Sequence, residues 1–183
     1  MPGSDVVIAN PDADGIGEIA VKGPQVMLGY YGDEKATNEA IRDGYLYTGD
    51  LGKFDKDGFL RISGRSKNVI VSSNGKNIFP EEIESLLNAN ELVKESLVYQ
   101  DPASNSRERL TAEVVIIDAV KQKIDDHPEA IEEIRKILQD YLSEVNKKLS
   151  DYKRIHNLKI RLSDFEKTST MKIKRFAFQS GTR

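Results

Sequence analysis

The sequence has no cysteine, only two histidines and no basic excess. Without cysteine the chain can form neither a disulfide framework nor a thiolate metal site, and His127 and His156 are too few for a multi-histidine metal centre. The net charge of −3 argues against a general nucleic-acid-binding protein, which would carry a basic excess or stripe. Apolar runs such as residues 114–117 are far too short to span a bilayer. These absences favour a protein of the cytoplasm with no metal ligands of its own and no transmembrane segment.

Length and composition fit one medium domain, or a small domain joined to a fragment of another. The 183 residues are 38% apolar and 31% charged, which is enough apolar material for a core but on the low side. The first four residues, Met-Pro-Gly-Ser, lead directly into Asp-Val-Val-Ile at residues 5–8, which has the apolar content of a strand. We interpret this start as a cut from a longer protein, with an ordinary N-terminal strand as the alternative.

Turn signals divide the first part of the chain into short strands. An Asp-Gly pair at residues 57–58 separates two apolar runs, and an Asn-Gly pair at residues 74–75 separates two more. Each pair predicts a β-hairpin, because glycine accepts a positive φ without steric cost. Asp33 is placed to cap a short helix that we expect to end near residues 43–44.

The rest of the chain combines strands with helices. Pro80 predicts the start of one helix, since its fixed φ suits the first turn, and a longer apolar stripe of helical period begins near Pro128. Strand patterns lie between these two helices, at residues 92–99 and 110–117, and after the second helix, at residues 157–162. A polar loop at Asp101-Pro102 joins the first two. The predicted class is α+β, a small mixed sheet with helices packed on it, preceded by short β-hairpins.

Charge is unevenly distributed in the second half. Residues 125–144 carry seven acidic and two basic side chains, whereas residues 147–175 carry ten basic and three acidic ones. The acidic stretch is most simply a solvated helix face. The basic stretch is either a solvated surface or a patch that attracts a phosphate-bearing ligand.

Three segments have patterns typical of binding or catalytic sites. Residues 45–52 contain Thr-Gly-Asp, in which a carboxylate on a glycine-flanked turn can accept hydrogen bonds from two neighbouring hydroxyls. The second segment combines Gly-Arg-Ser-Lys at residues 64–67 with Asn-Gly-Lys-Asn-Ile-Phe-Pro-Glu-Glu-Ile-Glu at residues 74–84. The third is Lys-Thr-Ser-Thr-Met-Lys-Ile-Lys-Arg at residues 167–175. Each segment alone is weak evidence for a site, because ordinary turns and charged loops can have the same sequence pattern. The order and spacing of all three segments together are specific.

Together the three segments resemble the adenylate-forming superfamily, which includes acyl-CoA synthetases, peptide-synthetase adenylation domains and luciferases. The resemblance covers about residues 17–175, and residues 72–84 and 165–175 are most similar to bacterial long-chain fatty acid–CoA ligases. The superfamily's phosphate-binding loop and acyl pocket have no counterpart in this sequence. The resemblance therefore implies that residues 1–66 end a large β-rich domain. Residues 67–183 would be a mobile small α+β domain after a hinge, with the missing N-terminal domain as its partner.

The resemblance also implies roles for five residues. Asp50 would hold the ribose hydroxyls of ATP and of the acyl-adenylate, and Arg65 would reach the same nucleotide. Lys67 would lie at the hinge between the domains. Gly75, at a hairpin tip, would approach the pantetheine arm of coenzyme A. Lys172 would be the catalytic residue that bridges the carboxylate and the α-phosphate during adenylation.

The implied activity is ATP-dependent ligation of a fatty acid to coenzyme A, with ATP, coenzyme A and Mg²⁺ as the cofactors of the complete enzyme. A first half-reaction gives acyl-AMP and pyrophosphate; the small domain then rotates, and the thiol attacks the acyl carbon. The partners would be these small molecules, not nucleic acid, and we expect the fragment alone to be inactive. Two positions depart from the family pattern: many relatives have proline at the position of Glu166 and glycine at that of Met171.

Alternatives stay open at this point. An enzyme of the same fold could load a carrier protein, and a stand-alone binding module could lack catalysis altogether. Asp50 also suits a turn cap, Arg65 suits a structural ion pair, and Lys174 is as cationic as Lys172. The two histidines are interpreted as surface or capping residues without a role.

Overall fold

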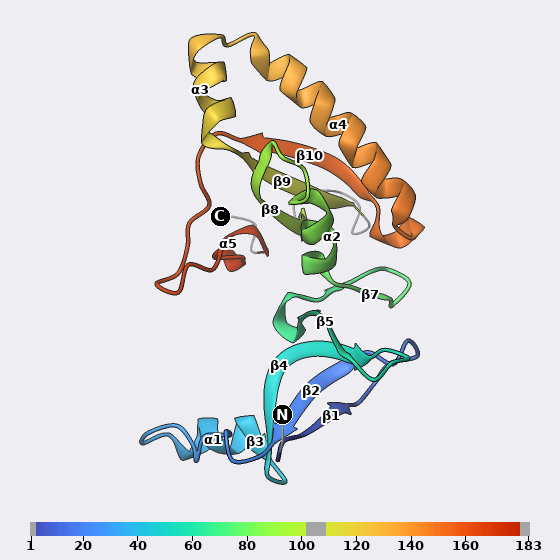
Figure 1. Cartoon of the computed structure of the whole chain (residues 1–183), viewed down its shortest axis with the longest axis vertical. Coiled ribbons are helices and arrows are strands. Elements are labelled where there is room, and N and C mark those ends of the chain that lie inside the picture. Colours follow the sequence, from blue (N-terminus) through green and yellow to red (C-terminus); the bar gives the residue numbers. More distant parts are fainter. Residues whose placement is uncertain (1–2, 102–108, 180–183) are drawn as a thin grey trace. The chain divides into compact units, whose positions relative to one another are not determined.

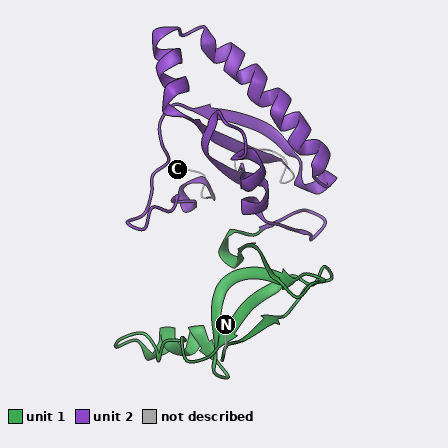
Figure 2. Cartoon of the chain, in the orientation of Figure 1, with its two compact units in different colours: residues 1–69 green, residues 70–183 purple. Residues whose placement is uncertain are grey.

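The computed structural model describes residues 3–101 and 109–179 of the chain (Figure 1). The chain divides into two compact units, Met1–Val69 and Ile70–Arg183, here termed unit 1 and unit 2 (Figure 2). The division falls close to the domain boundary predicted after residue 66. Short antiparallel strands in unit 1 and a mixed sheet with helices in unit 2 confirm the predicted α+β class.

Unit 1 is an antiparallel sheet in the order β1-β2-β4-β3, with β5 also paired to β4. Its elements are β1 (Asp5–Ala9), β2 (Gly17–Lys22), α1 (Glu34–Ala40), β3 (Ile41–Arg42), β4 (Tyr45–Phe54), β5 (Leu60–Arg65) and the 3-10 helix Ser66–Asn68. The hairpin predicted at residues 57–58 is confirmed. Gly58 has a φ of 81°, and the Asp55 amide donates to the Phe59 carbonyl at 2.9 Å.

Helix α1 begins where the sequence predicts but ends earlier. The Asp33 carboxylate caps it by accepting a hydrogen bond from the Ala36 amide at 2.9 Å. The expected end near residues 43–44 is wrong, because the helix ends at Ala40. Asp43 and Gly44 have φ values of 53° and 79°, the combination that a two-residue hairpin turn requires. This Asp-Gly pair therefore turns the chain from β3 into β4.

Unit 2 is built on a mixed sheet in the order β10-β9-β8, with β10 parallel and β8 antiparallel to β9. Its elements are β6 (Ile70–Val71), β7 (Asn77–Ile78), α2 (Pro80–Leu87), β8 (Val93–Gln100), β9 (Leu110–Ile116), α3 (Asp118–Asp126), α4 (Ala130–Lys148), the 3-10 helix Asp151–Lys153, β10 (Ile155–Arg161) and α5 (Phe176–Gln179). Strands β6 and β7 form the predicted Asn-Gly hairpin. Of the predicted loop at Asp101-Pro102, Pro102 lies outside the described residues.

Alternate residues of β9 contact two different layers. Ala112, Val114 and Ile116 pack against α2, α3 and α4, whereas Val115 packs with Phe165 of the C-terminal segment, residues 162–179. Every residue of β9 is buried, as expected of a central strand that is covered on both faces. The C-terminal segment is thus part of the folded unit and not a solvated tail.

The helices were predicted unequally well. Helix α2 starts at Pro80 as predicted, and its Ile83 and Leu87 are 0% and 2% exposed. Helix α3 is missing from the sequence analysis, because only Val120 and Ile124 mark its buried face within a polar segment.

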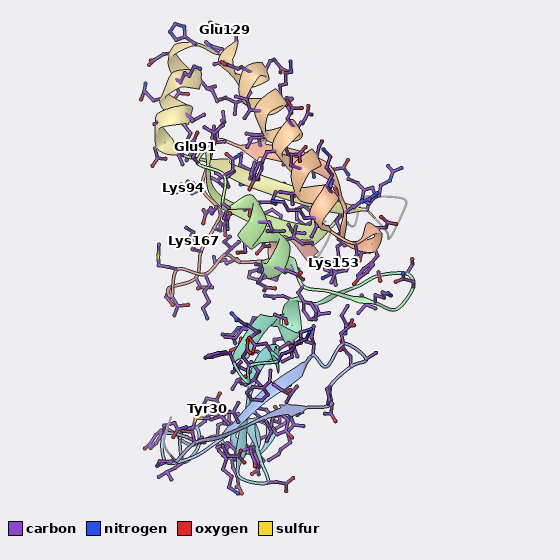
Figure 3. The ribbon with its side chains drawn as sticks, turned by 45° about the vertical axis from the view of Figure 1, so that its right-hand side comes forward. Tyr30, Glu91, Lys94, Glu129, Lys153 and Lys167 are labelled. Carbon is purple, nitrogen blue, oxygen red and sulfur yellow. The ribbon has the colours of Figure 1, made fainter. Side chains whose placement is uncertain are left out.

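A charged cluster fastens the segment that follows β10. Asp164 Oδ2 lies 2.8 Å from Nζ of Lys94 in β8, labelled in Figure 3, and Asp164 Oδ1 lies 3.0 Å from Nζ of Lys121 in α3. Hydrogen bonds from Lys94 and Lys121 lower the pKa of Asp164 from 3.8 to about 2. The carboxylate therefore stays charged at neutral pH and ties the start of the C-terminal segment to two elements of the unit.

Candidate functional site

Asp50 and Arg65, the two residues predicted to bind a nucleotide, lie opposite each other on β4 and β5. Arg65 Nε is 2.8 Å from Asp50 Oδ1, and the side chains are 47% and 30% exposed, respectively. An accessible guanidinium beside a carboxylate offers donors and an acceptor to one ligand, as ribose hydroxyls and phosphate oxygens require. The structure thus brings the two residues together within unit 1.

The backbone before Asp50 is held in an irregular conformation. Thr48 Oγ1 donates to the Ile19 carbonyl at 2.8 Å and accepts a hydrogen bond from the Asp50 amide at 3.1 Å. Gly49 has a φ of 72°, which favours glycine, and its amide donates to a Glu18 carboxylate oxygen at 2.9 Å. These bonds fix the Thr-Gly-Asp segment against β2 and set the direction of the Asp50 side chain.

A β-bulge next to Gly52 makes Arg65 the partner of Asp50. The register of β4 against β5 shifts there by one residue, so that Asp50 lies opposite Arg65 and not opposite Gly64. At Gly52 a β-carbon would lie 2.4 Å from the Arg61 carbonyl oxygen, which only glycine avoids. The glycine that closes the first motif is therefore needed for the pairing of the two polar residues.

Lys67, the predicted hinge residue, lies in the 3-10 helix Ser66–Asn68. This short helix comes directly before the division between the units, which falls between Val69 and Ile70. Its place in the chain suits a hinge, where a few backbone dihedrals change. The hinge itself stays a prediction.

Gly75 lies at the tip of the β6–β7 hairpin with a φ of 76°, and a β-carbon there would meet no atom within 4 Å. Its amide closes the turn by donating to the Ser72 carbonyl at 2.9 Å. Ser72 and Asn74 line a cavity of about 260 Å³, together with Tyr152 and His156. The hairpin therefore adjoins a cavity, and His156, to which the sequence analysis gave no role, is part of its lining.

Lys172 lies in a tight loop between Lys167 and Ile173, which form an antiparallel bridge. The Thr168 amide donates to the Lys172 carbonyl at 2.8 Å, and the Thr168 carbonyl accepts from the Met171 amide at 2.9 Å. Met171 has a φ of 61°. Met171 therefore has the left-handed backbone that glycine adopts easily, at a cost of about 1–2 kcal/mol for a residue with a β-carbon.

Within the described part of the chain, Lys172 differs from the basic residues around it in having no acidic partner. Each of the other three is paired: Lys167 with Glu95, Lys174 with Glu166, and Arg175 with Glu84. Among the described residues no carboxylate oxygen lies within 4.0 Å of Lys172 Nζ, and the residue is exposed. This difference separates Lys172 from Lys174, which the sequence alone does not.

The basic stretch at residues 147–175 is mostly neutralised within unit 2. In the part of the chain that the structure describes, all of its ten lysines and arginines pair with a carboxylate except Lys148 and Lys172. Paired surface charges attract a distant anion less than free ones. The structure therefore disfavours a broad phosphate-attracting patch and leaves one exposed cation in the predicted catalytic loop.

Glu84 is a residue of this site that the sequence analysis missed. It is 6% exposed on α2, and its partner Arg175 is 91 residues away in the chain. Its sequence signals are its place at the end of the second motif, residues 74–84, and its position directly after the buried Ile83 in the apolar stripe of α2. Within residues 3–101 and 109–179, no three histidine or acidic side chains gather as a metal site, and no helix has the length and apolar character to cross a membrane.

A family model described as AMP-binding enzyme C-terminal domain matches residues 67–180. The chain is 35% identical over 205 residues to the long-chain-fatty-acid–CoA ligase ACSBG2 of Gallus gallus. The aligned region covers 96% of this chain and 27% of that protein. The chain is 34% identical over 191 residues to the long-chain-fatty-acid–CoA ligase FadD15 of Mycobacterium tuberculosis, with coverage of 96% and 30%. The chain thus spans less than a third of the length of these relatives.

Solved structures of adenylate-forming enzymes are similar to this chain as well. The o-succinylbenzoate CoA synthetase of Bacillus subtilis, in complex with an acyl-adenylate intermediate, is similar with a TM-score of 0.74 and 27% identity, over 100% of this chain and 35% of that one. ATP-bound MatB of Rhodopseudomonas palustris has a TM-score of 0.70 and 28% identity, over 98% of this chain and 34% of that one. The chain belongs to the family of AMP-binding enzyme C-terminal domains, within the adenylate-forming enzymes.

Proposed function

We propose that this chain is the C-terminal part of an ATP-dependent fatty acid–CoA ligase, in which Lys172 acts in the adenylation half-reaction. The observation that carries the proposal is the exposed Lys172, in a loop whose neighbouring cations all have carboxylate partners. The long-chain-fatty-acid–CoA ligases among the relatives support a fatty acid as substrate class. The acyl-adenylate and ATP complexes among similar structures support the nucleotide.

We assign residues 1–66 to the end of a large domain and residues 67–183 to a mobile small domain that turns at Lys67. Unit 1 exposes large apolar side chains that the rest of a large domain would cover, such as Leu28, Tyr31 and Ile62, which are 103%, 107% and 69% exposed. On this assignment the 183 residues hold only part of the active site and are inactive alone.

In the first half-reaction a carboxylate oxygen of the fatty acid attacks the α-phosphorus of ATP. The new oxygen–phosphorus bond forms as the bond to the leaving pyrophosphate breaks, which gives acyl-AMP. Asp50 would accept hydrogen bonds from the ribose hydroxyls, and Arg65 beside it would donate to the same nucleotide. Lys172 would stabilise the negative charge between the carboxylate and the α-phosphate. Mg²⁺ would offset the charge of the ATP phosphates, and we assign no residue of this chain as its ligand.

In the second half-reaction the thiol of coenzyme A attacks the acyl carbon of acyl-AMP, and AMP leaves. Gly75 would let the thiol arm pass close to the hairpin tip, because no side chain obstructs it. The adjoining cavity, with Ser72, Asn74 and Tyr152 in its lining, offers the mixture of polar groups and an aromatic ring that suits a nucleotide-bearing ligand. We place the reaction in the cytoplasm, where ATP and coenzyme A are both available.

The test uses the full-length ligase that contains this chain, incubated with ATP, coenzyme A and fatty acids of graded length. We expect fatty-acid-dependent release of pyrophosphate and AMP together with acyl-CoA, and none of these products from the 183-residue chain alone. Loading of a carrier protein predicts acyl-AMP without acyl-CoA, and a stand-alone binding module predicts no consumption of ATP. Acyl-CoA formation by the 183-residue chain would contradict the assignment of its residues to an incomplete active site.

A further inference from the structure

We infer that Glu84 is a positioning residue for Lys172 and that it acts through Arg175. The inference rests on the proposed role of Lys172 and adds the residues that keep this lysine in place and away from other carboxylates. Glu84 belongs to α2, whereas Lys172 and Arg175 belong to the C-terminal segment. The ion pair between Glu84 and Arg175 is therefore a long-range contact that ties the catalytic loop to the core of unit 2.

Glu84 joins three parts of unit 2. Arg175 Nη1 donates to Glu84 Oε1 at 2.8 Å, and Arg175 Nη2 donates to Glu84 Oε2. The Val98 amide of β8 donates to the same Oε1 atom at 2.7 Å. Only 8% of the Glu84 side chain and 19% of the Arg175 side chain are exposed. A bidentate pair between planar groups fixes direction as well as distance, so it anchors the chain three residues after Lys172.

Arg175 keeps its positive charge at neutral pH. Burial opposes the charge on Arg175, but hydrogen bonds and the attraction of Glu84 and Glu81 outweigh it, so the pKa of Arg175 lies above its ordinary value. Arg175 Nη2 also lies 3.8 Å from Glu81 Oε1. The guanidinium therefore faces carboxylates from two positions of α2.

The chain before Lys172 has an anchor of its own. Nζ of Lys167, labelled in Figure 3, lies 2.8 Å from Oε2 of Glu95 in β8. Ile173 packs against the buried cluster that contains Leu97 and Phe165. With the bridge between Lys167 and Ile173, both ends of the loop are fastened to the same face of the sheet.

These pairs also keep Lys172 free for an anionic substrate. A carboxylate without a partner near an exposed lysine would attract it and compete with the substrate. Arg175 pairs with both oxygens of Glu84, and Lys167 pairs with Oε2 of Glu95, so the carboxylates that fasten the two ends of the loop already have cationic partners. Loss of the Glu84 charge would leave a buried guanidinium unpaired, and the end of the loop would move to solvate it. Such a movement matters, because a misplacement of 1 Å can cost about 100-fold in rate.

The first test uses the 183-residue chain and needs no enzymatic activity. Glu84→Gln keeps the size of the side chain and an acceptor for the β8 amide, but it removes the charge that holds Arg175. We expect hydrogen exchange of the Thr168 and Met171 amides, which close the loop, to become about tenfold faster or more, while β9 amides keep their rates. The matched control is Glu166→Gln, which removes an 83% exposed carboxylate of the same loop and leaves these amides unchanged.

The second test uses the full-length ligase. Glu84→Gln is expected to lower kcat of fatty-acid-dependent ATP–pyrophosphate exchange about 10- to 100-fold. KM for ATP and the rate of thioester formation from supplied acyl-AMP should stay within about twofold. Because the effect passes through Arg175, adding Glu84→Gln to Arg175→Lys should lower the exchange rate little further. If Glu84 merely stabilised the fold, Glu84→Gln would lower the rates of both half-reactions together. That result would contradict the inference.

If Glu84→Gln fails to fold, Arg175→Lys decides in its place, since lysine keeps the charge but loses the bidentate geometry. We expect the same faster loop exchange and the same selective loss of pyrophosphate exchange. Wild-type loop exchange and wild-type pyrophosphate exchange in a folded variant would overturn the inference. If the wild-type ligase shows no fatty-acid-dependent exchange, the proposed function fails, and the loop amides alone then decide whether Glu84 holds the loop.

Discussion

Lys172→Ala is expected to lower fatty-acid-dependent ATP–pyrophosphate exchange in the full-length ligase by about 100- to 1,000-fold. The reason is that the variant removes, from a loop fixed at both ends, the one exposed cation that has no carboxylate partner among the residues the structure describes. Thioester formation from supplied acyl-AMP should stay within about threefold of wild type, because the charge that Lys172 stabilises develops only during adenylation.

The matched control for this prediction is Lys148→Ala. Lys148 is the other exposed lysine of the basic stretch that has no carboxylate partner within 4.0 Å among the described residues, and it lies at the end of α4. Its removal changes the net charge by the same amount and should leave both half-reactions unchanged. Equal losses in the two half-reactions of Lys172→Ala, or no loss in either, would contradict the assigned role.

Ile83→Ala is expected to lower the free energy of unfolding of unit 2 by about 2–5 kcal/mol. Ile83 is 0% exposed and belongs to the core cluster with Val98, Leu142 and Ile155. The truncation leaves a cavity where α2, α4 and the sheet meet, and the neighbouring side chains can fill it only partly. Urea unfolding followed by circular dichroism at 222 nm measures the loss, because α2, α3 and α4 all lie in unit 2.

Ile137→Ala provides the control for the core substitution. Ile137 is 42% exposed on α4, so the same change of residue type removes little buried surface. Its effect on the free energy of unfolding should be within about 0.5 kcal/mol. A shift of the urea midpoint in Ile83→Ala that is no larger than the shift in Ile137→Ala would contradict the packing described for α2.

Local signals explain why much of the fold could be predicted from the sequence. The Asp-Gly pair at residues 57–58 and the Asn-Gly pair at residues 74–75 form hairpin turns in which glycine has a positive φ. Pro80 begins α2 because its φ and its missing amide hydrogen both suit a first helical turn. Helix α3 lacked such a signal, since its buried face consists of only Val120 and Ile124.

The details of the site depend on contacts that no local pattern reveals. The pairing of Asp50 with Arg65 depends on a bulge, and a one-residue change of register would place Arg65 on the other face of the sheet. Likewise, Lys172 and Lys174 are equivalent in sequence. They differ because Lys174 meets Glu166 and Lys172 meets no carboxylate among the residues described. The ion pair of Glu84 with Arg175 joins segments that only the tertiary fold brings together.

We propose that a fatty acid carboxylate attacks the α-phosphorus of ATP in the ligase that contains this chain. An oxygen-18 label in that carboxylate tests this step most directly. With full-length ligase, ATP, coenzyme A and a fatty acid whose carboxylate carries oxygen-18, each AMP should contain one labelled oxygen. The reason is that the oxygen bonded to phosphorus leaves with AMP when the thiol attacks the acyl carbon. AMP without label, or label in inorganic phosphate with formation of ADP, would contradict the claim.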